Sequence, residues 1–208
     1  MIEEIATPEE RLSILKALWD KVKPGGSLVV IEPGSPMGFR FINDTRNWLR
    51  EKGKKEANIY APCPHQKDCP MAKDSKKWCH FEQKYERYPK DVLGKAPHEK
   101  MVRIGKFSYL MTRKGELNVK EEEARTPAEK SFFWPRIVRQ PSIKKRHVWL
   151  ELCNVEGEIE KRSIIKLENK EKGSYKESKK SNWGDLWPYS MRIPNKYRKD
   201  KRFGKRLW

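Results

Sequence analysis

The sequence predicts an α/β fold at its N-terminal end, followed by a cysteine-rich insertion, a small antiparallel β region and a basic extended tail. In the first segment, amphipathic and apolar stretches alternate in the order helix, strand, helix. In the second, three of the four cysteines lie within 23 residues, from Ala61 to Gln83. The final segment is rich in Lys, Arg and aromatic residues. We therefore expect three regions, at residues 1–60, 61–166 and 167–208.

The first predicted helix covers the stretch TPEERLSILKALWDKVK. Thr7 is placed to cap its N-terminus, and Pro8 occupies the first helical position. Leucine, tryptophan and valine then recur at helical spacing, which indicates an amphipathic helix that ends at Pro24-Gly25-Gly26.

The run SLVVIE is short and continuously apolar, which is typical of a strand buried on both faces of a parallel sheet. A Gly/Pro loop, PGSPMGF, and a second helix, RFINDTRNWLREKGKK, follow it. This unit resembles the fifth-strand region of a class I, Rossmann-like methyltransferase. In that fold, S-adenosylmethionine binds at the ends of the first strands, next to a Gly-rich turn, and the GSPMG loop does not have that spacing. We expect the C-terminal half of such a sheet, not catalytic by itself, which a separate chain could complete.

The cysteines follow the spacing C-x5-C-x9-C, with a fourth at position 153. Lysines surround the first three, so these thiols are more readily explained as metal ligands than as buried apolar side chains. The spacing alone leaves a zinc site and an iron–sulfur cluster open. It also leaves open a zinc site in which His65 or His80 replaces Cys153, and four free thiols.

The segments HVWLELC and EIEKRSIIK, joined by NVEG, predict a β-hairpin, with Gly157 in a left-handed turn position. Cys153 ends the first of these strands, so the hairpin can bring it to the other cysteines. KFSYLMTR predicts a further short strand.

The chain has 47 Lys and Arg against 29 Asp and Glu, a net charge of +18, which favours a polyanionic partner such as nucleic acid. A membrane surface fits less well, because no apolar run approaches the length that spans a bilayer. We expect the phosphate contacts to come from the stretch PRIVRQPSIKKRH and from the tail. The candidate residues are Arg136, Arg139, Lys144, Lys145, Arg146, Lys179, Lys180, Arg198 and Lys199. Trp183 and Trp187 are explained equally well by stacking on bases and by packing of the tail.

Several specific motifs occur in one order: APCPH, DCPM, WCHFEQ, KFSYLMTR, PRIVRQP, HVWLELC and YKESKKSNWGDLWP. In this the chain resembles the methyltransferase-like protein 17 family, which includes the yeast mitochondrial small-subunit Rsm-type protein. The resemblance implies a protein of the mitochondrial matrix that resides in the small ribosomal subunit or assists its assembly. Its implied partners are small-subunit rRNA and other mitoribosomal proteins, and its implied cofactor is a 4Fe-4S cluster on Cys63, Cys69, Cys79 and Cys153. The alternative function is that of an S-adenosylmethionine-dependent rRNA methyltransferase, or one half of a split one.

Overall fold

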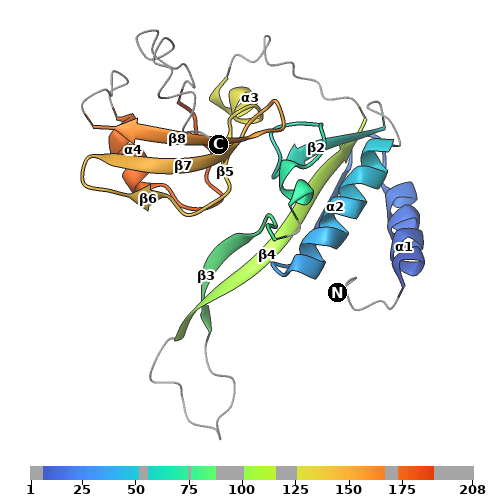
Figure 1. The fold of residues 1–208 in the computed structure, drawn as a ribbon. Coiled ribbons are helices and arrows are strands. Elements are labelled where there is room, and N and C mark those ends of the chain that lie inside the picture. Colours follow the sequence, from blue (N-terminus) through green and yellow to red (C-terminus); the bar gives the residue numbers. More distant parts are fainter. Residues whose placement is uncertain are drawn as a thin grey trace, which may run out of the picture.

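Two four-stranded antiparallel sheets form the body of the protein (Figure 1). The computed structural model describes residues 7–51, 56–74, 76–87, 101–115, 126–166 and 173–189. Among these, no helix is long and apolar enough to cross a membrane.

The first sheet is built around β4 (Met101–Lys114), which pairs along one edge with β1 (Ser27–Pro33). Along its other edge, β4 pairs with β2 (Ala57–Ala61) and then with β3 (Phe81–Arg87). Helix α2 (Pro36–Glu51) covers one face, and α1 (Pro8–Lys21) lies beside α2 (Figure 1).

The core between these helices and the sheet is apolar, as burial of one face of each element requires. It contains Trp19 of α1, Phe41 and Leu49 of α2, and the cross-strand pair Val30 and Leu110. This core fixes α2 against the sheet, and α2 in turn carries one wall of the site described below.

The predicted helices are confirmed, but α1 ends at Lys21, two residues before the predicted end, and residues 52–55 of the second predicted helix lie outside the described residues. The Thr7 side chain accepts a hydrogen bond from the Glu10 N–H at 3.2 Å, as expected of the N-cap of α1. Helix α2, however, begins at Pro36, inside the stretch predicted as a loop. The Ser35 hydroxyl accepts the Gly38 N–H at 2.9 Å, so Ser35 caps a helix that starts earlier than its apolar pattern indicates.

The expectation of a parallel strand buried on both faces is wrong for β1 within the described residues. Its partner β4 is antiparallel, and α2 covers only one of its faces. On the opposite face Val29 and Ile31 are 51% and 60% exposed. Because β4 completes this sheet, the sheet also does not end near residue 60, where the sequence suggested a boundary.

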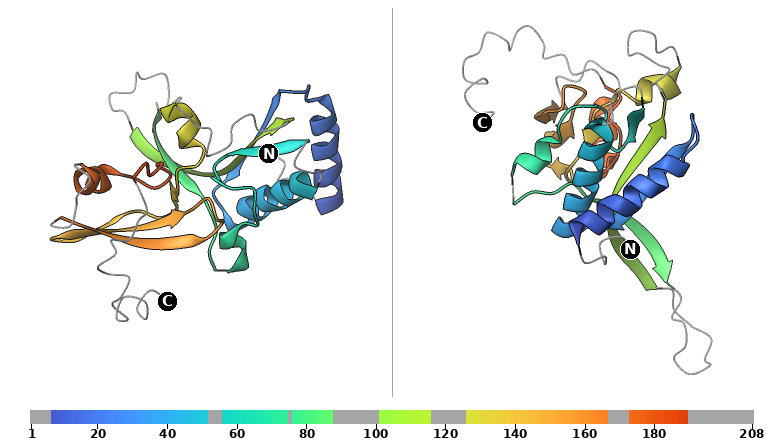
Figure 2. Two further views of the ribbon diagram at one scale, coloured as in Figure 1. Left: turned by 90° about the horizontal axis from the view of Figure 1, so that it is seen from above. Right: turned by 90° about the vertical axis from the view of Figure 1, so that its right-hand side faces the viewer.

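Strand β4 is much longer than the short strand predicted from KFSYLMTR. Its first half pairs with β3 as a two-stranded ribbon, and this part of the first sheet projects away from the rest of the described structure (Figures 1 and 2).

The second sheet is the predicted small antiparallel region. Strand β7 (His147–Cys153) pairs with β8 (Ile159–Ile165) on one edge, and with β5 (Arg136–Ile137) and β6 (Ser142–Ile143) on the other. The predicted β7–β8 hairpin is confirmed, with Gly157 at φ 75° in its turn. Helix α3 (Pro127–Ser131) precedes β5, and α4 (Ser174–Lys180) packs on β7 and β8. The core of this unit consists of Ile137, Val148, Leu150, Leu152 and Trp187.

Candidate metal centre

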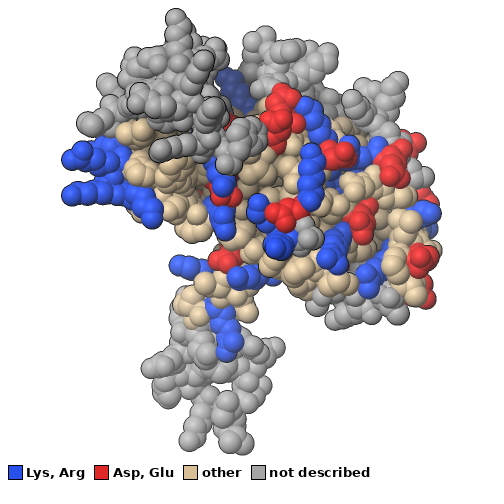
Figure 3. Space-filling view, viewed as in Figure 1, with Lys and Arg blue, Asp and Glu red and all other residues tan. Residues whose placement is uncertain are grey.

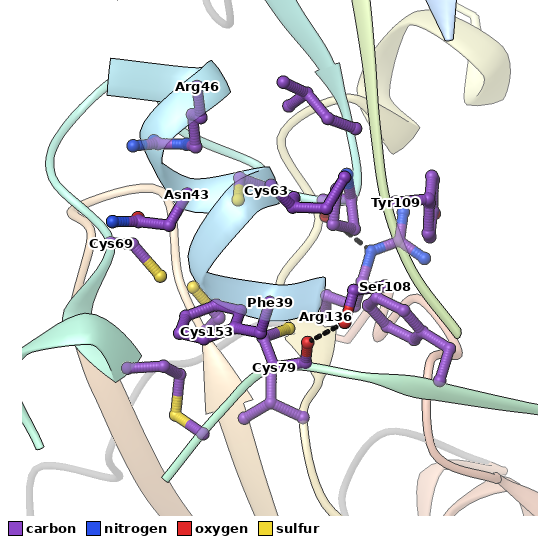
Figure 4. A pocket seen from close by; sticks show the side chains of 16 residues that line it. Phe39, Asn43, Arg46, Cys63, Cys69, Cys79, Ser108, Tyr109, Arg136 and Cys153 are labelled. Carbon is purple, nitrogen blue, oxygen red and sulfur yellow. Dashed lines mark hydrogen bonds between the residues drawn. The ribbon is translucent and has the colours of Figure 1, made fainter. Parts of the chain in front are cut away.

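All four cysteines line one cavity where the two sheets meet (Figure 4). Cys63 follows β2, Cys69 precedes the short 3-10 helix η2 (Pro70–Lys73), Cys79 lies shortly before β3, and Cys153 ends β7. All four are free thiols. The fold therefore brings together the residues that the sequence proposed as ligands, including the one that is distant along the chain.

The loop that carries the first three cysteines is held against the first sheet by specific hydrogen bonds. The Gln66 side chain pairs with both backbone groups of Ile59, at 3.0 and 2.7 Å, which folds the loop back on β2. The Ser108 hydroxyl of β4 donates to the carbonyl of Cys79 at 2.8 Å. Farther along, Trp78 Nε1 donates to the carbonyl of Gly34 at 3.0 Å. These bonds set where Cys63, Cys69 and Cys79 enter the cavity.

Arg46 of α2 forms part of the cavity wall and is only 2% exposed. Its Nη2 donates to the carbonyl of His65 at 3.3 Å and to the carbonyl of Lys67. Its Nε and Nη1 have no hydrogen-bond partner among the described residues. A buried cation with unpaired donors is costly unless an anionic group faces it, so this wall of the cavity suits a negatively charged occupant.

Arg136, which the sequence placed among the phosphate contacts, also lines this cavity. Its Nε donates to the carbonyl of Pro62 and its Nη1 to the carbonyl of Gly184, both at 2.6 Å. These bonds tie the cysteine loop to the segment after α4. The structure therefore separates Arg136 from the other basic residues of its stretch and directs its hydrogen bonds into the protein.

His65 links the two sheets through both of its ring nitrogens. Nδ1 accepts the Lys67 N–H at 3.2 Å and lies 3.4 Å from Arg46 Nη2, which is also a donor. In a neutral ring the proton must then be on Nε2, which lies 3.4 Å from Cys153 Sγ. Burial, followed by the charge of Arg46, lowers the pKa of His65 to about 4, so the ring is neutral at physiological pH. The Nε2–H therefore donates to the Cys153 sulfur.

The β7–β8 turn packs directly on the cysteine loop beside this contact. A Cβ on Gly157 would lie 3.1 Å from Cβ of Lys67, and Lys67 forms an ion pair with Glu156 across the junction. Close packing here fixes Cys153 relative to the loop.

Burial raises the pKa of the Cys69, Cys79 and Cys153 thiols, and the neighbouring Cys63 raises each of them further. Metal ligation requires thiolates, so a metal that binds here must displace protons. Within the described ranges, no group of three or more His, Cys, Asp or Glu side chains is arranged to hold one metal ion.

The remaining candidate residues fall into separate places. Trp187 is buried in the core of the second sheet, and the Trp183 ring lies 4.3 Å from that of His80, so the structure favours packing for both. Arg139, Lys144, Lys145 and Arg146 are exposed on the connections between β5, β6 and β7. Lys179 and Lys180 are exposed on α4, and Arg198 and Lys199 lie outside the described residues.

Sequence reasoning did not identify Arg46 or Ser108 as parts of the site. The signal for Arg46 is its position four residues before Arg50 on one face of α2, since Arg50 also donates to the cysteine loop, at the carbonyl of Gln66 (2.6 Å). Ser108 has no such signal, because its role depends on the pairing of β4.

Comparison with known proteins gives one family and several relatives. Residues 1–188 match the family model described as "Mitochondrial small ribosomal subunit Rsm22". The fission yeast "Rsm22-cox11 tandem protein 2, mitochondrial" is 29% identical over 91% of this chain and 28% of its own length. The human "Ribosome assembly protein METTL17, mitochondrial" is 29% identical over 90% of this chain and 38% of its own length. The baker's yeast "Ribosome assembly protein RSM22, mitochondrial" is 27% identical over 79% of this chain and 39% of its own length. The chain thus spans well under half of each of these relatives.

Proposed function

Because this chain belongs to the Rsm22 family of mitochondrial small ribosomal subunit proteins, we propose that it acts in assembly of the mitochondrial small subunit as a non-catalytic, rRNA-binding protein. The three relatives named above are all mitochondrial by name, and two of them are named as ribosome assembly proteins. We place the chain in the mitochondrial matrix with small-subunit rRNA and other proteins of that subunit as its partners.

The observation that carries the proposal is the convergence of Cys63, Cys69, Cys79 and Cys153 on one cavity between the two sheets. We assign to these residues a 4Fe-4S cluster, in which each iron takes one thiolate. Such a group cross-links the cysteine loop to the end of β7 and so joins the two sheets into one rigid body.

The choice of this group over a single zinc ion rests on the family resemblance, while one feature of the cavity supports a thiolate-ligated group of either kind. The buried Arg46, with Nε and Nη1 unpaired in the described structure, suits the negative charge of a thiolate-ligated cluster.

The rRNA contacts are assigned to the exposed basic residues of the second sheet. Arg139, Lys144, Lys145 and Arg146 follow one another along the connections between β5 and β7. Arg139 is in contact with Glu151 at 3.2 Å, while the other three form no ion pair with a described residue. Lysine and arginine at such positions neutralise phosphates and position the protein without selecting sequence.

The methyltransferase alternative rests on one observation. Strand β1 is at the end of its sheet, with an edge to which no described strand pairs, and Val29 and Ile31 are exposed beside it. A further part of a methyltransferase-like fold, supplied by a separate chain, would pair with this edge and pack on these side chains.

The proposed role is tested by sedimentation. The tagged protein, expressed in cells whose own family member is depleted, should co-sediment with the small subunit or its precursors in mitochondrial lysates. Restored small-subunit levels would support the assembly role. Sedimentation at the top of the gradient, with no effect on subunit levels, would overturn it.

A further inference from the structure

The two faces of the second sheet differ in what covers them. Val148, Leu150 and Leu152 of β7 point into the core with Trp187, on the side where α4 packs. Alternation along a strand places Trp149 on the opposite face, where it is 40% exposed. An exposed tryptophan on a sheet whose other face is filled is a candidate contact for a partner.

The neighbours of Trp149 leave its ring accessible from both adjacent strands. Its direct cross-strand partners are Ser142 on β6 and Ser163 on β8, both small. The ring of His147 lies 5.8 Å away in a T-shaped arrangement. Because no large side chain stands directly opposite on either strand, a planar group has room to lie against the indole.

Positive charge gathers at the end of the sheet next to Trp149. The turn between β6 and β7 contains Lys144, Lys145 and Arg146, and a hydrogen bond from the Lys166 N–H to the Arg146 carbonyl, at 3.0 Å, brings Lys166 beside them. Residues 142–147 and 163–166 contain no Asp or Glu. In Figure 3, Lys and Arg side chains project from the end of the molecule where Figure 1 labels β6.

The pattern changes along β7 toward the cysteines. Glu151, on the same face as Trp149, lies 3.2 Å from Arg139 and 3.6 Å from Lys161, so its charge is matched. The net positive charge is therefore concentrated at the outer end of the sheet, beside Trp149 and away from Cys153.

We propose that Trp149 and the Lys144–Arg146 turn form a binding surface for unpaired RNA, in which a base stacks on the indole and adjacent phosphates contact the lysines and arginine. This deepens the proposed rRNA binding and rests on it. Single-stranded RNA exposes base faces that stack on aromatic side chains, whereas a duplex hides them. The centre of a protein–protein interface is depleted of lysine, so the lysine-rich surroundings favour RNA over a protein partner.

The test measures the affinity of the full chain, purified with any metal group that it holds, for two RNAs. One is an unstructured 12-nucleotide single strand, and the other is a duplex of equal length. Trp149→Ala should weaken binding of the single strand about tenfold, as loss of one stacked base does elsewhere. It should leave duplex binding and the salt dependence unchanged. Trp149→Phe, which keeps an aromatic face, should retain most of the affinity. Ile143→Ala, a truncation of another exposed apolar side chain on the neighbouring strand, is the matched control and should have no effect.

A second variant separates this inference from the proposed function. Replacing Lys144, Lys145 and Arg146 with Ala should weaken the binding of both RNAs. It should also flatten the salt dependence of binding, because each phosphate contact contributes to that slope. Salt-dependent RNA binding that is unaffected by Trp149→Ala would overturn the stacking surface alone. No RNA binding by the wild-type chain would overturn rRNA binding as well. If a protein stays bound to the wild-type chain after nuclease treatment and is lost from Trp149→Ala, the surface binds protein. That result would also overturn the inference.

Discussion

His65 Nε2 lies 3.4 Å from Cys153 Sγ, across 88 residues of sequence. Two donors at Nδ1, the Lys67 N–H and Arg46 Nη2, fix the tautomer that directs the Nε2–H at the sulfur. The contact connects the cysteine loop of the first sheet to the last residue of β7. It is the clearest sign that Cys153 belongs to the same site as the other three cysteines.

Cys153→Ser should be about as damaging as Cys63→Ser, although Cys153 is far away in sequence. A cross-link between residues 63 and 153 closes a loop of about ninety residues, and its loss should cost on the order of 4 kcal/mol by analogy with a covalent cross-link of that length. Chemical denaturation of the loaded protein measures the change. Ser163→Ala on the adjacent strand is the control and should stay near wild type. A Cys153→Ser protein that keeps both the visible absorbance of a bound cluster and wild-type stability would refute Cys153 as the fourth ligand.

His65→Phe should leave the cluster bound but lower its reduction potential. The Nε2–H stabilises the more negative, reduced state through its hydrogen bond to sulfur, so removal of the donor favours the oxidised state. His65→Gln offers an amide N–H at a similar reach and should recover part of the potential. Redox titration of the three proteins tests the effect. Equal potentials in wild type and His65→Phe would mean that the contact is only a packing contact.

The metal-free chain should lose stability as pH falls from about 6.5 toward 4, in part because of His65. In the unfolded chain this histidine takes up a proton near pH 6.5, whereas burial holds its folded pKa at about 4. As the pH falls, His65 is therefore protonated in the unfolded state before it is protonated in the folded state. This difference should reduce the free energy of unfolding by about 2 kcal/mol at pH 4.5. Denaturant unfolding at a series of pH values, with a chelator present, measures this change. The free energy of unfolding should fall less steeply with decreasing pH in His65→Gln than in the wild-type chain. Identical pH profiles would contradict the assigned pKa.

This chain alone should not bind S-adenosylmethionine. The described sheet contains β1, β4, β2 and β3, and none of their loops has the Gly-rich turn that holds that cofactor. Isothermal titration of the 208-residue chain should give no heat of binding. Micromolar binding by the chain alone would contradict this expectation, and binding only after a second chain is added would favour the split-methyltransferase alternative.

The sequence was most informative where structure is local. The cap at Thr7, the helical spacing in α1 and the β7–β8 hairpin are encoded by neighbouring residues, and each is confirmed. The resemblance to the family also gave the four cysteines, which share one cavity.

The errors come from tertiary pairing, which a single segment does not encode. The apolar run of β1 is compatible with a parallel or an antiparallel partner, and only the return of β4 decides between them. Arg136 sits in a basic stretch, yet the fold turns it inward to the carbonyls of Pro62 and Gly184. Charged residues in a sequence are on average exposed, but the sequence does not show which arginine instead forms hydrogen bonds inside the protein.

The central claim is that the four cysteines hold an iron–sulfur cluster that joins the two sheets. The most direct measurement is the iron, zinc and acid-labile sulfide content of the chain purified without oxygen. The cluster predicts about four iron and four sulfide per chain, lost together in Cys153→Ser. One zinc per chain without sulfide, or a metal-free protein of unchanged stability, would contradict it.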